Sequence, residues 1–226
     1  MDVAPRRILD IGQAVLAHNQ GLADALRSEF RQRGMFVMNI VSSPGAGKTA
    51  LLEKTLAAVA PDIPTGVIVG DLATDHDARR LDGKGARVLQ VTTDGYCHLE
   101  ANMVRAAADS LGIDDLKLLI VENVGNLVCP SSHDLGEDVR VALHCATEGE
   151  DKPLKYPVLF KSSHVVVVSK IDLAEACEFD LPSALQNIAS VAPQARVFVT
   201  SAKSGEGLAG WFDAIREWVG AKSQNN

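Results

Sequence analysis

The sequence lacks both an apolar run long enough to cross a membrane and the apolar segment of a signal peptide. Its longest apolar stretches, such as 118–121 and 165–168, have only the length of a β-strand, whereas a membrane helix needs about 20 apolar residues. The first ten residues, MDVAPRRILD, carry charges and lead into no apolar core of the kind that signal peptides have. These absences predict a protein that has no membrane segment and stays in the cytoplasm.

Positive charge and cysteine are also scarce. The 226 residues contain 22 Lys and Arg against 29 Asp and Glu, a formal net charge of −7, and domains that bind nucleic acid usually have the opposite sign. Four cysteines in a reducing compartment do not indicate a disulfide framework, so their positions raise the question of metal binding or reactivity. The composition, 46% hydrophobic and 23% charged, predicts an ordinary globular protein without nucleic-acid or membrane partners.

Short β-branched runs alternate with helical stretches along the chain. Strands are expected at about 36–42, 66–70, 87–92, 117–122, 139–144, 164–169 and 196–200, and helices near 48–60, 74–82, 98–111, 181–190 and 206–219. This alternation is typical of a parallel sheet covered on both faces. We therefore predict an α/β fold, a three-layer sandwich with a mostly parallel sheet.

An amphipathic helix is expected before this sandwich. Apolar residues between positions 6 and 33 recur at helical spacing, with an interruption near Gly21, and Gly34 marks the stop. The predicted organisation is an N-terminal helical extension at 1–34, one domain at 35–222 and a polar tail at 223–226.

A glycine-rich loop follows the first predicted strand. Residues 42–49 read SSPGAGKT, which resembles the P-loop pattern G-x-x-x-x-G-K-[ST] except that Ser42 replaces the first glycine. In a P-loop, backbone N–H groups surround phosphates at a helix N-terminus, while the lysine reaches the β- and γ-phosphates and the hydroxyl binds Mg²⁺. A serine is tolerated at position 42 if its φ is not positive. The domain is thus predicted to be a P-loop NTPase whose phosphate-binding residues are Pro44, Gly45, Ala46, Gly47, Lys48, Thr49 and Ala50.

Acidic residues follow two of the other predicted strands. Asp71 comes after one strand, Asp75 lies a helical turn later, and Glu122 closes the very apolar run 118–121. Ligands of parallel α/β sheets lie at the carboxyl ends of the strands, and Mg²⁺ prefers oxygen donors. We therefore predict a Mg²⁺ site of Thr49, Asp71 and Glu122, and a catalytic set of Lys48, Asp71, Asp75 and Glu122. Gly125 would let a backbone amide approach the γ-phosphate.

Two short motifs at the ends of the last two predicted strands indicate the base. Residues 169–172 read SKID and residues 201–203 read SAK, which resemble the guanine-specificity motifs [NT]KxD and SAK of GTPases. A carboxylate such as that of Asp172 can accept two hydrogen bonds from guanine, and adenine offers no such pair of donors. GTP is therefore expected over ATP, with the base bound by Lys170, Asp172, Ser201, Ala202 and Lys203.

Three soft or borderline donors lie near these loops. Cys97 and His98 follow the third predicted strand, and Cys129 comes seven residues after Glu122. Thiolate and imidazole suit Ni²⁺ and Zn²⁺, and a set of three ligands leaves room for release of the ion or for sharing across a dimer. By spacing alone, an isolated cysteine is more often a small core residue.

Four stretches of the chain resemble the HypB family, nickel-handling P-loop GTPases of the SIMIBI class that act in [NiFe]-hydrogenase maturation. They read GDLATDHDA at 70–78, CHLEANMV at 97–104, ENVGNLVCP at 122–130 and TEGEDKPLKYP at 147–157. The resemblance implies a GTP-hydrolysing protein that forms a homodimer when GTP is bound, with Cys97, His98 and Cys129 as its metal site. It also implies delivery of nickel to the hydrogenase large subunit, with a HypA-type zinc protein as partner. Zn²⁺ fits the same three ligands.

Three positions depart from the family pattern. Ser42 and Ser169 replace the usual Gly and Asn, which predicts a slower or weaker GTPase, and Asn102 stands where many members have a second histidine. Two alternatives therefore stay open: a urease-type nickel GTPase, and a metal-binding scaffold with little GTP turnover. The remaining cysteines, Cys145 and Cys177, are assigned to packing. His76, His133 and His144 could each add a labile metal ligand, but they are expected at the surface or capped by a hydrogen bond.

Overall fold

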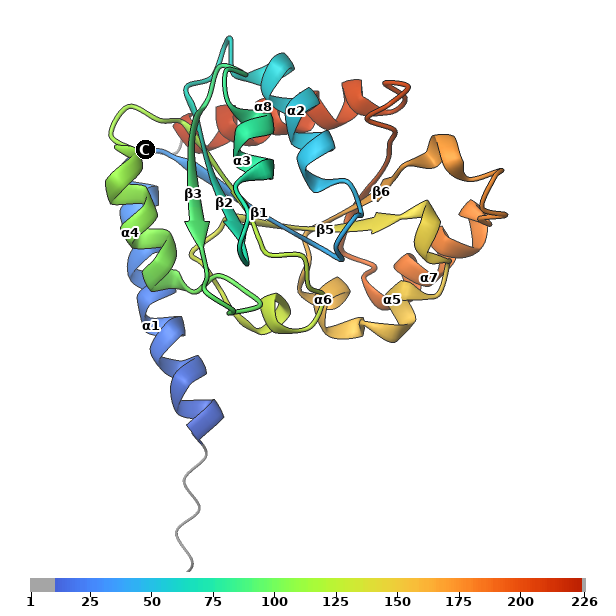
Figure 1. Ribbon diagram of the computed structural model, residues 1–226, viewed down its shortest axis with the longest axis horizontal. Helices are drawn as coiled ribbons and strands as arrows, with labels where there is room; N and C mark the ends of the chain where they lie inside the picture. The colour runs from blue at the N-terminus through green and yellow to red at the C-terminus, as the bar shows by residue number, and fades with distance from the viewer. Residues whose placement is uncertain (1–10, 225–226) are drawn as a thin grey trace, which may run out of the picture.

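The seven runs predicted as strands pair in a single sheet (Figure 1). The computed structural model describes residues 11–224, and its strands are β1 Phe36–Ser42, β2 Thr65–Asp71, β3 Arg87–Thr92, β4 Leu118–Glu122, β5 Val139–Cys145, β6 Val165–Ser169 and β7 Arg196–Val199. Their order is β3-β2-β4-β1-β5-β6-β7, and each pair of neighbours runs parallel. The predicted α/β sandwich is confirmed.

Helices cover both faces of this sheet. They include α1 Ile11–Gln32, α2 Lys48–Val59, α3 His76–Leu81, α4 Ala101–Leu111, α7 Leu181–Val191 and α8 Leu208–Gln224. Alternate residues of β1 define the two faces, because Met38 packs in the cluster that contains α2 and α8, whereas Val37 packs in the cluster that contains α1 and α4. A third cluster joins β6 to α6 and α7. The three layers are visible in Figure 1.

Several short elements were absent from the prediction. They are the helices α5 Lys152–Lys155 and α6 Pro157–Ser162, and the 3₁₀ turns η1 Cys129–Ser132, η2 Ala146–Glu148 and η3 Ile171–Leu173. Two predicted helices are shorter than expected, since α4 begins at Ala101 and α3 spans only His76–Leu81. At the other end, α8 extends to Gln224 and includes the first two residues of the predicted tail. Within residues 11–224, no helix has the length and apolar character needed to cross a membrane.

The N-terminal helix α1 is continuous through Gly21, so the predicted interruption is wrong. Residues 6–10 of the predicted helix lie outside the described residues. Leu26 and Phe30 are fully buried, while Val15 of the predicted apolar stripe is 48% exposed. Asn19 links the helix to two loops, because its side chain donates to the Asp134 carbonyl oxygen (2.8 Å) and accepts from the Ala101 amide (2.9 Å). Helix α1 therefore contacts the segments that follow the candidate metal ligands.

Candidate nucleotide and metal sites

The glycine-rich loop joins β1 to α2. Gly45 and Gly47 have φ values of +75° and +98°, which favour glycine because other residues rarely adopt this region. Ser42, the last residue of β1, has no positive φ. The backbone condition for a serine at this position is therefore met.

Lys48 begins α2 and is buried against this loop. Its Nζ donates a hydrogen bond to Ser42 Oγ over 3.0 Å. Burial lowers the pKa of Lys48, while the nearby carboxylates of Glu122, Asp77 and Asp71 act in the opposite direction. The amino group of Lys48 thus lies at the phosphate loop, close to these three carboxylates.

Glu122 ends β4 and is only 2% exposed. Its Oε1 accepts a hydrogen bond from Thr49 Oγ1 (2.9 Å), whereas its Oε2 has no hydrogen-bond partner among the described residues. Burial raises the pKa of Glu122 to about 7, although Lys48 and Thr49 act to lower it. A buried carboxyl oxygen without a partner is costly, so this oxygen is available to a ligand.

Asp71 ends β2, the strand next to β4, and lines the same cavity. Its Oδ1 accepts hydrogen bonds from the amides of Ala73 (3.0 Å) and Thr74 (2.8 Å). Partial burial would raise the pKa of Asp71, but these two bonds, with the Thr74 hydroxyl and Lys48, lower it. The carboxylate is therefore held in its charged form.

These groups line a cavity of about 450 Å³. Its walls are Pro44, Gly45, Gly47, Lys48, Thr49, Ala50, Asp71, Leu72, Asp77, Arg80, Glu122, Val124, Gly125 and Lys170. Gly125 lies so close to the loop that a Cβ atom there would be 3.1 Å from the Cα of Pro44. A larger residue at position 125 would therefore displace the phosphate loop.

Asp75 does not line this cavity. It precedes α3 and forms an ion pair with Arg79 on the surface, with 2.7 Å between Oδ2 and Nη2. Asp77 and Arg80, two residues that the sequence analysis passed over, line the cavity instead. The catalytic role assigned to Asp75 stays a prediction.

A second cavity of about 250 Å³ adjoins the first and shares Gly47, Ala50 and Lys170 with it. Asp172, Ala202 and Lys203 line it. Ser201 lies behind this wall and donates a hydrogen bond to Asp172 Oδ1 over 2.5 Å. The residues predicted to bind the base thus meet beside those predicted to bind phosphate.

Ser169 and Lys170 both bind the phosphate loop. Ser169 Oγ donates to the Ala46 carbonyl oxygen over 2.7 Å, and Lys170 Nζ donates to the Gly45 carbonyl oxygen over 2.6 Å. Lys170 also has a positive φ of +56°. The serine that replaces the usual Asn therefore joins the base-binding segment to the phosphate loop through its hydroxyl.

Cys97, His98 and Cys129 come together at the ends of two loops. The donor atoms of these three residues all lie within 4.8 Å of one another, and Cys97 Sγ lies 3.7 Å from His98 Nδ1. Burial lowers the pKa of His98, and the neighbouring His133 adds to this effect. The sequence spacing gave little evidence for this cluster, but the fold forms it.

The segment between Glu122 and Cys129 is hydrogen-bonded to the loop that carries Cys97 and His98. Asn123 Oδ1 accepts from the Leu99 amide (3.1 Å), and Asn126 Nδ2 donates to the Cys97 carbonyl oxygen (3.4 Å). One short stretch of chain therefore contacts the segment of Cys97 and also leads directly from the nucleotide cavity to Cys129.

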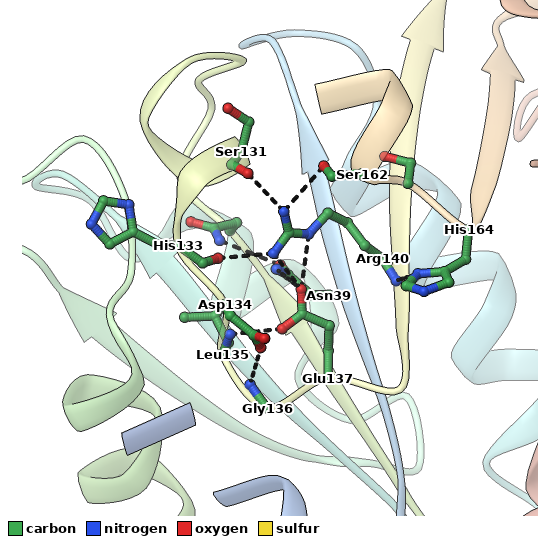
Figure 2. A network of polar contacts seen from close by, with 12 residues as sticks. Asn39, Ser131, His133, Asp134, Leu135, Gly136, Glu137, Arg140, Ser162 and His164 are labelled. Atoms are coloured by element: carbon green, nitrogen blue, oxygen red, sulfur yellow. Dashed lines mark hydrogen bonds and ion pairs between the residues drawn. The ribbon is translucent and has the colours of Figure 1, made fainter. Parts of the chain in front are cut away.

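A buried ion pair holds the other side of the Cys129 loop (Figure 2). Arg140 of β5 pairs with Glu137 (2.7 Å) and donates to the carbonyl oxygens of Ser131 (2.8 Å) and His133 (2.9 Å). Glu137 also accepts from the Leu135 amide (2.7 Å). Because these buried groups satisfy one another, they fix the backbone that carries Cys129.

Glu100 was missed as a neighbour of the metal ligands, whereas His133 was among the histidines considered as a labile ligand. The rings of His98 and His133 have centroids 3.9 Å apart, and His98 Nε2 lies 3.6 Å from Glu100 Oε1. His133 is capped as expected, since its Nδ1 lies 2.9 Å from the Cys129 carbonyl oxygen. Its spacing of four residues from Cys129 was the available signal.

The remaining cysteines and histidines agree with the prediction at some positions and differ from it at others. Cys145 is buried as predicted, but Cys177 is exposed, so its assignment to packing is wrong. His76 is exposed as predicted. His144 is 1% exposed, and neither ring nitrogen has a hydrogen-bond partner among the described residues. The expectation of a surface or capped histidine is therefore wrong there, because β5 is covered on both faces.

Known proteins resemble the chain over most of its length. Residues 36–199 match the family described as CobW/HypB/UreG, nucleotide-binding domain. Hydrogenase maturation factor HypB of Escherichia coli is 43% identical over 211 residues, which cover 93% of this chain and 73% of that protein. Hydrogenase/urease maturation factor HypB of Helicobacter hepaticus is 37% identical over 225 residues, which cover 98% and 90%. The crystal structure of HypB from Helicobacter pylori in complex with nickel matches with a TM-score of 0.85 at 38% identity, covering 92% of this chain and 96% of that one.

Proposed function

The chain belongs to the CobW/HypB/UreG family and within it to the HypB proteins, and from this premise we propose that it hydrolyses GTP and delivers nickel for [NiFe]-hydrogenase maturation. Nickel is the cargo, and Cys97, His98 and Cys129 bind it. The state of the nucleotide sets the affinity of this site for nickel. The protein is a cytoplasmic homodimer when it has bound GTP.

One observation carries this proposal. The segment that begins at Glu122, inside the nucleotide cavity, ends at Cys129 and contacts the loop of Cys97 and His98 through Asn123 and Asn126. A shift of this segment on loss of the γ-phosphate would change the geometry of all three nickel donors. Because tight packing makes such segments switch rather than deform continuously, hydrolysis is coupled to nickel release.

The nucleotide cavities support GTP as the substrate. The hydrogen bond from Ser201 to Asp172 Oδ1 supports a role for this carboxylate in accepting the two donors of guanine. The N–H groups of the loop and Lys48 bind the phosphates, and Lys48 leaves Ser42 for the β- and γ-phosphates as they arrive. Asp71, Glu122 and Asp75 complete the catalytic set that we propose.

The residues around Glu122 fit a magnesium ion. Thr49 supplies a hydroxyl oxygen, while Glu122 supplies a buried carboxyl oxygen that has no hydrogen-bond partner in the described chain. Asp71, which lines the same cavity at the end of the neighbouring strand, supplies a third oxygen donor. Mg²⁺ prefers such oxygen donors, and when bound it would neutralise negative charge on the phosphates.

The partners follow from the same family. A HypA-type zinc protein and the hydrogenase large subunit are the proposed source and destination of nickel. Zn²⁺ competes for the same soft donors. The relative from Helicobacter hepaticus is named a hydrogenase/urease maturation factor, which favours nickel delivery to a urease as the second candidate function.

A scaffold with little GTP turnover is the other candidate, and two contacts weaken it. Ser42 accepts a hydrogen bond from Lys48, and Ser169 binds the Ala46 carbonyl oxygen. Both unusual serines therefore have defined places in the nucleotide site. A turnover assay with GTP separates a scaffold from an enzyme.

The proposal is tested by nickel titration with calorimetry, recording oligomer size alongside. Wild type and Cys129→Ala are each loaded with a Mg·GTP analogue or with Mg·GDP. We expect the GTP-analogue form to dimerise and to bind Ni²⁺ more tightly than the GDP form, and Cys129→Ala to lose this binding. Cys177→Ala, which removes an exposed cysteine, is the matched control. If the affinity for nickel is the same in both nucleotide states and is unchanged in Cys129→Ala, the proposed delivery mechanism is contradicted.

A further inference from the structure

The ring of His98 has donor groups on both sides. Its Nδ1 faces Cys97 Sγ at 3.7 Å, on the side of the thiolates. Its Nε2 lies 3.6 Å from Glu100 Oε1, is buried, and has no hydrogen-bond partner among the described residues. Because a buried polar atom without a partner is costly, the second nitrogen is available to a ligand that the thiolates do not reach.

His133 presents a second imidazole beside that of His98. Its ring centroid lies 3.9 Å from that of His98. Its Nδ1 lies 2.9 Å from the Cys129 carbonyl oxygen, and since a carbonyl only accepts, Nδ1 carries the proton and Nε2 keeps its lone pair. Histidines that bind metal commonly donate the other N–H to a backbone carbonyl in this way.

The backbone of His133 is also held in place. Figure 2 shows its ring directed away from Arg140, while its carbonyl oxygen accepts from Arg140 Nη2 over 2.9 Å. A ring with a fixed tautomer on a fixed backbone is preorganised to bind an ion.

Glu100 completes a set of three donors. His98, Glu100 and His133 each offer one donor atom, and the three atoms lie within 4.8 Å of one another. Two imidazoles and a carboxylate suit Zn²⁺ and Ni²⁺ and are harder donors than the thiolates beside them. Because this set does not use position 102, the asparagine there is no obstacle to it.

We propose that the chain has a second position for a divalent metal ion, formed by His98 Nε2, Glu100 and His133, beside the position of the two thiolates. This second position binds Ni²⁺ or Zn²⁺. The proposal rests on the proposed function only for the identity of the metal that the protein delivers. Since His98 belongs to both sets, an ion can exchange harder donors for softer ones without leaving the protein.

The test removes the thiolates and keeps the second position. The Cys97→Ala/Cys129→Ala variant is titrated with Ni²⁺, and its nickel coordination is examined by X-ray absorption spectroscopy. We expect Ni²⁺ to bind with nitrogen and oxygen ligands alone. Adding His133→Phe, or Glu100→Gln, to this variant should raise the Kd for Ni²⁺ by about tenfold or more.

Two controls separate the outcomes. His76→Phe, which changes an exposed histidine outside the cluster, should leave the Kd of the thiolate-free variant unchanged, and circular dichroism checks that each variant is folded. If neither His133→Phe nor Glu100→Gln weakens Ni²⁺ binding, the second position does not exist. X-ray absorption spectroscopy of nickel-loaded wild-type protein tests the proposed function separately. If sulfur is absent from its nickel ligands, delivery of nickel through the thiolates is contradicted, whereas the second position is not.

Discussion

Lys48 donates a hydrogen bond over 3.0 Å to Ser42, the residue that replaces the first glycine of the P-loop pattern. Both side chains are buried, and Ser42 in turn donates to the Ser43 carbonyl oxygen over 2.7 Å. The serine therefore supplies an acceptor for a buried ammonium group, which glycine at this position could not do.

Removal of this hydroxyl should destabilise the nucleotide-free protein. We expect Ser42→Ala to lower the free energy of unfolding by about 1–3 kcal/mol, because the buried ammonium loses an acceptor. With a saturating Mg·GTP analogue the difference should shrink, since phosphate oxygens replace the hydroxyl. Urea denaturation with and without the analogue measures both values. Ser190→Ala, at an exposed serine, is the control, and equal loss in the two conditions would contradict the exchange of partners.

Asp172 should determine the choice of base. We expect Asp172→Asn to weaken GTP binding by on the order of 100-fold, because the amide group cannot accept both donors of guanine. Ser201→Ala, which removes only the hydrogen bond that positions the carboxylate, should weaken it by about tenfold or less. Binding of fluorescent GTP and ATP analogues measures this. An equal loss for both nucleotides, or a similar loss in the exposed Asp62→Asn control, would show that Asp172 does not read the base.

The order of strands and helices was predictable because burial on both faces leaves a simple pattern. Strand β6, for example, contains the continuous apolar run 165–168 that a parallel sheet requires. The helices α5 and α6 were missed because they are short, with a proline in the first turn of each, and apolar periodicity does not reveal elements of this length.

The candidate site was predictable where a motif ties several residues to one ligand. The P-loop and the guanine motifs placed their residues around two adjoining cavities. The position of Asp77 rather than Asp75 in the cavity wall depends on how α3 begins, and no sequence pattern specifies that. The contact of His133 with His98 depends on the Arg140 network, which joins residues of a loop and a strand.

Glu122 should make stability fall as pH rises. Its pKa is about 7 in the folded protein against 4.5 ordinarily, so the folded state binds its proton more tightly than the unfolded state does. The stabilising contribution is present below pH 4.5 and is lost as pH rises to 7. Glu122→Gln cannot titrate and keeps an acceptor for Thr49, so its free energy of unfolding, relative to wild type, should increase from pH 5 to pH 8 by up to about 3 kcal/mol.

The measurement is urea denaturation in EDTA without nucleotide, because Mg²⁺ would favour the carboxylate. Titrating groups that do not interact with Glu122 contribute equally to both proteins and cancel in the difference. Glu53→Gln, which changes an acid on α2 that pairs with Arg80, is the comparison. A difference between Glu122→Gln and wild type that stays constant with pH would mean that Glu122 titrates alike in both states.

His144 should lower the free energy of unfolding, and should lower it further at acidic pH. Its ring packs among Phe160 and Phe179 without a hydrogen-bond partner in the described chain, and burial lowers its pKa below the ordinary 6.5. For a histidine whose folded pKa is depressed, the unfolded state takes up the proton first, so stability is lost as pH falls through 6.5. His144→Leu removes the buried polar ring and its titration. We expect it to raise the free energy of unfolding by about 1–3 kcal/mol at pH 7.5 and by more at pH 5.5. The control His76→Leu, at an exposed histidine, should not raise the free energy of unfolding at either pH. If His144→Leu is less stable than wild type at both pH values, the packing of the ring outweighs its missing hydrogen bonds.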